Sequence, residues 1–139
     1  MKNSICALIF FSILSLTISS CNNDDDTNAI ESLNGNYTGI FTVVYTNGDT
    51  FSNSVTVSFT GGNNYQSSGN SNSFPAGGNG TYEINNSTMT FNDINIWTAD
   101  FDWNLILSGV YTYTINGDAL SISANKNNVG FYSYELMKD

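Results

Sequence analysis

Hydrophobic and polar residues alternate in short runs along most of the chain. The clearest run covers residues 51–60, where Val55, Val57 and Phe59 alternate with serine and threonine. A period of two is typical of a strand with one buried face, and no stretch after Cys21 has apolar residues at helical spacing. The pattern predicts an all-β domain.

The turn sequences between these runs predict how the strands are connected. Asn47-Gly48-Asp49 and Asn116-Gly117-Asp118 tolerate the positive φ angles of tight hairpins. Residues 69–80 hold the only proline and are expected to form the one long loop. The runs expected to be strands are residues 40–45, 51–60, a short piece around 65, 82–84, 89–91, 101–107, 110–115, 120–122 and 131–137.

Hairpin connections place neighbouring strands of the sequence side by side, which gives a meander. An open meander has two exposed edges, and closing it into a barrel removes both of them. We therefore expect an up-and-down antiparallel β-barrel of about eight strands, with a β-sandwich as the alternative. Eight strands enclose just enough space for side chains or one small ligand.

The N-terminus has the pattern of a secretory signal. Lys2 supplies a positive charge, residues 5–18 are mostly apolar, and small residues precede Cys21. The apolar run is too short for a stable membrane-spanning helix. Ile18-Ser19-Ser20-Cys21 resembles a bacterial lipobox, which implies cleavage after residue 20 and acylation of Cys21. The alternative is an ordinary secretory signal with an incidental cysteine.

An acidic, polar stretch follows the cysteine at residues 22–28. Its composition predicts a solvated tether. It also resembles the surface-export signal of Bacteroidota lipoproteins, and the two interpretations are compatible. We expect a signal peptide at 1–20, a lipidated tether at 21–32 and a barrel domain at 33–139. The expected location is the outer membrane, with the protein anchored by lipid at Cys21 and exposed on the cell surface.

The charged residues exclude several classes of function. The chain has three lysines, no arginine, no histidine and a net charge of −9, so a nucleic-acid partner is not expected. Without histidine there is no Ser-His-Asp or Cys-His catalytic unit. Cys6 would be removed with the signal and Cys21 would be consumed by lipid, which leaves no thiol for a disulfide or a nucleophile. No cofactor and no metal site are expected.

Three short segments resemble the lipocalin-like domains of bacterial surface lipoproteins. Leu33-Asn34-Gly35-Asn36-Tyr37 is similar to the first lipocalin strand, with tyrosine in place of tryptophan. Residues 130–138 are similar to the last strand of such domains, and residues 97–103 to part of their middle. The resemblance implies a lipocalin-like barrel that binds a ligand without catalysis.

Asp100 and Asp102 are the candidates for chemistry, because on a strand they would share one face. Paired carboxylates can hydrolyse glycosides, and with Asp93 they could bind Ca²⁺. At a turn, however, aspartate more often accepts a backbone N–H, and we favour that structural interpretation. No residue is therefore assigned a catalytic role.

Aromatic side chains are the candidates for binding. Trp103 alternates in phase with Phe101 and Leu105, which predicts a buried ring, whereas Trp97 is out of phase and is the better candidate to face a ligand. The expected function is a non-enzymatic module that binds a small apolar or amphipathic ligand inside the barrel. The alternatives are a module with a filled barrel that binds a glycan or a protein on its surface, and, less favoured, a hydrolase. The candidate ligand-binding residues are Trp97, Trp103, Tyr82, Tyr111 and Tyr113.

Overall fold

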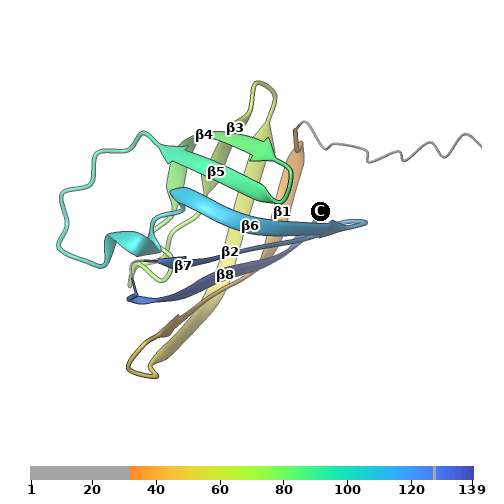
Figure 1. The fold of residues 1–139 in the computed structure, drawn as a ribbon. Coiled ribbons are helices and arrows are strands. Elements are labelled where there is room, and N and C mark those ends of the chain that lie inside the picture. The colour runs from red at the N-terminus through yellow and green to blue at the C-terminus, as the bar shows by residue number, and fades with distance from the viewer. Residues whose placement is uncertain (1–31, 127) are drawn as a thin grey trace, which may run out of the picture.

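A computed structural model of the chain describes residues 32–126 and 128–139, and it shows a closed antiparallel barrel in which each strand pairs with the next and β8 pairs with β1 (Figure 1). The prediction of an up-and-down barrel is confirmed. The predicted signal peptide, Cys21 and residues 21–31 of the predicted tether lie outside the described residues. The strands are β1 Gly35–Tyr45, β2 Thr50–Thr60, β3 Asn64–Ser67, β4 Gly78–Asn85, β5 Thr88–Asp93, β6 Gly109–Asn116, β7 Ala119–Lys126 and β8 Gly130–Lys138.

The hairpin turns occur where their sequences predict them. Gly48 between β1 and β2 has φ 94°, and Gly117 between β6 and β7 has φ 60°. Residues with side chains rarely adopt such positive φ angles, so these glycines determine where the two strands of each hairpin reverse. Asn86, at φ 50°, serves the same purpose between β4 and β5.

Side chains fill the interior of the barrel. Alternate residues of every strand point inward and pack mainly as edge-to-face aromatic rings, such as Phe91 against Tyr111 with centroids 5.7 Å apart. Ile84, Tyr113 and Ala124 lie against this core and are only partly buried. The largest fully buried side chains are Tyr65, Tyr82, Tyr111, Tyr132, Tyr134, Phe41, Phe59, Phe91, Met89, Leu105, Leu107 and Leu120.

The two ends of the barrel differ. The start of β1 and the end of β8 meet at one end, where Gly35 has the Lys138 side chain beside it; we call this the terminal end. The opposite end carries two long connections, residues 68–77 and residues 94–108, and we call it the loop end (Figure 1). The prediction of a single long loop at 69–80 is therefore wrong, because β4 already begins at Gly78 and a second loop precedes β6.

Candidate functional site

The 94–108 loop folds across the loop end and covers the core. Its backbone bonds to the other long loop, with Ala76 N donating to Leu105 O at 3.0 Å and Leu107 N to Gly77 O at 2.8 Å. Leu105 and Leu107 are buried in the core. The two loops are therefore bonded to each other and together cover the loop end of the barrel.

The strand predicted for residues 101–107 is wrong. Trp103–Leu105 forms a 3-10 helix, and Asp102 caps its start by accepting the backbone N–H of Asn104 at 2.9 Å. Ile106 is buried together with its two neighbours, so strict alternation is lost. A short polar side chain that caps a turn outweighed the local pattern here. The structural interpretation of Asp102 as a cap is confirmed.

Asp102 is also the centre of a hydrogen-bonded cluster beneath the loop. One carboxylate oxygen accepts the hydroxyls of Tyr132 at 2.6 Å and Tyr45 at 3.1 Å, and the other accepts Asn104 Nδ2 at 2.8 Å. Burial favours the protonated form of Asp102, but the hydrogen bonds from Tyr132, Asn104 and Tyr45 outweigh it and lower the pKa of the carboxyl. Because its oxygens are engaged in this way, Asp102 is held as a structural carboxylate.

Lys126, the last residue of β7, bonds the barrel to the 94–108 loop. Its Nζ donates to the carbonyl oxygens of Asn104, Ile106 and Ser108 at 3.2, 3.3 and 2.9 Å. The ammonium also lies 4.6 Å from the centroid of the Tyr111 ring, a cation–π distance. Burial lowers the pKa of Lys126 to about 8, against the attraction of Asp102. Lys126 was not among the residues predicted from the sequence, although it continues the inward positions of β7 after Leu120, Ile122 and Ala124.

The structure places Trp97 at intermediate burial and Trp103 on the surface. Trp97 donates from Nε1 to Asp93 Oδ2 at 2.6 Å and packs edge-to-face on Phe101. Trp103 is 60% exposed, so the prediction that it is a core residue is wrong. The short 3-10 helix rotates its ring outward, away from Leu105, which enters the core. Trp103 is thus the large aromatic ring that this loop presents to solvent.

A pocket of about 380 Å³ lies beside the Trp103 ring. Asn104 and Ser108 line it from the loop, Val110 from β6, and Asn125 and Lys126 from β7. The Trp103 Nε1–H points to Ala99 O at 3.4 Å, within the loop. An exposed aromatic plane therefore borders amide and hydroxyl groups that can both donate and accept hydrogen bonds.

The other predicted binding residues lie in different places. Tyr82 is buried and its hydroxyl donates to Leu33 O at 3.0 Å, whereas Tyr111 lies in the core under Lys126. Tyr113 is half-buried and its hydroxyl donates to Asn86 O at 2.8 Å. The structure does not bring these tyrosines together with the tryptophans into one accessible site. Asn104, Ser108 and Asn125 accompany Trp103 instead, and nothing in the sequence pattern singles them out.

Other kinds of site find little support in the described part of the chain. Over residues 32–126 and 128–139, no group of three or more His, Cys, Asp or Glu side chains could hold a metal ion. Among the same residues, no helix has the length and apolar character needed to cross a membrane. The pocket beside Trp103 is the candidate binding site.

The chain was also compared with known proteins at three levels. No family model, no curated protein and no solved structure matches it.

Proposed function

We propose that this protein is a non-enzymatic binding module, anchored to the outer membrane through Cys21, that binds carbohydrate on its outer surface at Trp103. The exposed Trp103 ring beside the Asn125 amide and the Ser108 hydroxyl is the observation that carries this proposal. Flat aromatic rings stack on the apolar faces of sugars, and side-chain amides match hydroxyl groups that both donate and accept.

The packed interior favours a ligand site on the surface over one inside the barrel. Aromatic and aliphatic side chains from the strands occupy the barrel, and Leu105, Leu107 and Lys126 close the loop end. A ligand inside the barrel would have to displace several fully buried rings, each worth several kcal/mol of core packing. The surface alternative, a filled barrel with an exposed aromatic site, therefore has more support than the interior ligand.

The arrangement of the two ends fits surface display. Leu33, which precedes β1, is held by the Tyr82 hydroxyl, so the chain joins the barrel at the terminal end. The 94–108 loop, which carries Trp103, lies at the loop end, on the far side of the barrel from this attachment (Figure 1). A barrel held through residues 21–32 would present the Trp103 pocket away from the membrane.

The anchor has its own test. In a bacterial host of the native type, Cys21→Ser should release the protein from the membrane fraction and abolish incorporation of labelled fatty acid, because the thioether to lipid cannot form. Several acyl chains on one residue bury enough methylenes for stable anchoring, so the redistribution should be nearly complete. Ser20→Ala serves as the control, since it keeps the cysteine. Unchanged partitioning of the Cys21→Ser protein would refute the anchor.

The binding site is tested by removing the aromatic plane. Trp103→Ala should weaken binding of neutral oligosaccharides by more than about tenfold, since truncation of an aromatic anchor typically costs about 2 kcal/mol or more. Its melting temperature should stay close to that of the wild type, because the ring is exposed. Binding is measured by titration calorimetry against glucose-, mannose- and xylose-based oligosaccharides.

Ile96→Ala is the matched control for this experiment. Ile96 lies on the same loop and is 92% exposed, but it does not line the pocket. Equal affinity of the wild type and the Trp103→Ala variant for a sugar that binds would place the site elsewhere.

A second candidate function is binding of a protein partner at the loop end. Ile94 and Ile96 are 66% and 92% exposed on the 94–108 loop, and exposed aliphatic side chains that lie close together are typical of protein interfaces. The Ile96→Ala variant separates the two candidates, because loss of a partner through Ile96 with unchanged sugar binding would favour the protein interface.

A further inference from the structure

The Trp103 pocket is the first part of a longer groove. A second pocket, of about 210 Å³, shares Val110 and Asn125 with it. A third pocket, of about 460 Å³, shares Asn125 and Phe131 with the second and reaches Val44 of β1 and Thr46 in the turn after it. The three pockets thus follow one another across the outside of β6, β7, β8 and β1, with Asn125 common to all three.

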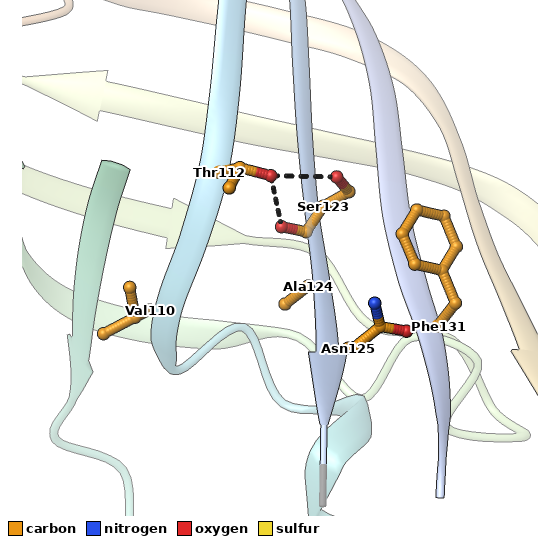
Figure 2. Close-up of a pocket in the computed structure, with 6 residues that line it drawn as sticks. All are labelled: Val110, Thr112, Ser123, Ala124, Asn125 and Phe131. Carbon is orange, nitrogen blue, oxygen red and sulfur yellow. Dashed lines mark hydrogen bonds between the residues drawn. The ribbon is translucent and has the colours of Figure 1, made fainter. Parts of the chain in front are cut away.

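The strand pairing explains why the surface is hollowed here. The pairing of β6 with β7 ends at Thr112 and Ser123, whereas β7 remains paired with β8 as far as Lys126 and Gly130. The last part of β7 therefore separates from β6. Figure 2 shows the result: Val110 lies on one side of the opening and Phe131 on the other, with Ala124 and Asn125 between them.

The groove carries an exposed aromatic ring on each side of its centre. Trp103 borders the first pocket, and Phe131, which is 41% exposed, borders the second and third. Hydroxyl and amide side chains lie between and around them, and Thr112 Oγ1 and Ser123 Oγ are 3.2 Å apart at its upper edge (Figure 2). Rings separated by uncharged polar groups suit a chain of sugar units, each with an apolar face and a rim of hydroxyls.

The charges of the groove indicate a neutral ligand. The chain has twelve acidic residues, yet none of the described residues that line the three pockets is Asp or Glu. The charged side chain among them, Lys126, directs its ammonium to three backbone carbonyls of the cover. The net charge of −9 would also repel an acidic polymer.

A peptide fits this groove less well than a sugar chain. Extended peptides usually bind by adding a strand to an open sheet edge. Here β7 stays paired with β8 along the groove, and its side facing β6 is unpaired only over residues 124–126, which is too short an edge to hold an added strand firmly. The ligand must instead be held by side chains from several strands.

We propose that the ligand is a neutral, linear oligosaccharide several units long, which lies along the groove from Trp103 to Phe131 and Val44. This deepens the proposed function and rests on it. Single sugars would occupy the Trp103 pocket alone, so affinity should rise with chain length as units reach the second and third pockets.

The test is a length series on the purified protein. Glucose-, mannose- and xylose-based oligosaccharides of one to six units are titrated by calorimetry, together with uronic-acid oligosaccharides as the charged comparison. For the sugar type that binds, affinity should increase by at least about tenfold between the shortest and longest neutral chains, as one further aromatic contact supplies. The charged chains should bind more weakly than neutral chains of the same length.

Two variants on β8 show whether the far part of the groove is used. Phe131→Ser should lower affinity for the longest chains by about tenfold and leave that for the shortest within about twofold. Met137→Ser is the matched control, because Met137 is also an exposed apolar residue of β8, 54% exposed, but lies outside the groove. Melting curves of both variants confirm that they fold.

The outcomes separate this inference from the proposed function. Binding that requires Trp103 but is independent of chain length and of Phe131 would overturn the groove and keep the Trp103 site. Stronger binding of uronic-acid chains would overturn the neutral ligand. Absence of binding by every member of the series would overturn the carbohydrate function itself. Capture of a protein through Phe131 that sugars do not displace would likewise overturn the proposal.

Discussion

Raising the pH above 10 should unfold this protein over a narrow range. Seven of its eight tyrosines have raised pKa values, chiefly because burial disfavours the phenolate; that of Tyr45, for example, is raised to about 12 by burial and by Asp102. Unfolded tyrosines release their protons near pH 10, while the folded ones retain theirs. The folded state then holds more protons, so the free energy of unfolding falls with pH, by up to about 1.4 kcal/mol per pH unit for each fully buried tyrosine.

Lys126 acts in the opposite direction at lower pH. Its pKa is about 8 in the folded protein and about 10.5 when unfolded, so between these values the unfolded state binds more protons and stability rises with pH. Chemical denaturation from pH 7 to 12 should therefore show a maximum between pH 8 and 10, followed by a steep fall. Lys126→Gln should flatten the rise and keep the fall. A constant stability up to pH 12 would show that the tyrosines are not buried as described.

Phe41→Ala should remove about 3–5 kcal/mol of stability, because it leaves a cavity where a fully buried ring packs on Tyr134. This is a large part of the 5–15 kcal/mol expected for a domain of this kind. Urea denaturation measures the change.

The neighbouring Ile40→Ala is the control for the same strand. Ile40 points outward and is 47% exposed, so its truncation should cost much less. Similar losses for both variants would mean that the inward face of β1 has been assigned incorrectly.

Much of the fold can be predicted from local patterns because each hairpin is local. Period-two alternation shows which face of each strand is buried, and positive-φ turns such as Gly48 and Gly117 fix where strands reverse. Closure follows from the need to pair the edges. Closure is the one inference here that concerns a contact far apart in the sequence, the pairing of β1 with β8.

The candidate site could not be predicted in the same way, since it depends on contacts between distant segments. Residues 101–107 alternate like a strand, but Asp102 caps a 3-10 helix. Its carboxylate also accepts hydrogen bonds from Tyr45, 57 residues earlier, and from Tyr132, 30 residues later. In this 3-10 helix the Trp103 ring is exposed, whereas Leu105 is buried. Likewise, Asn125 lines a groove only because β6 separates from β7 beside it.

The central claim, that sugar binds on the Trp103 ring, can be measured directly because the chain has only two tryptophans. In the Trp97→Phe variant, the tryptophan fluorescence, excited at wavelengths that tyrosine does not absorb, comes from Trp103 alone, which is 60% exposed and open to the neutral quencher acrylamide. Addition of a neutral oligosaccharide that binds by calorimetry should protect this ring and lower the quenching constant. Unchanged quenching at saturating sugar would contradict the claim.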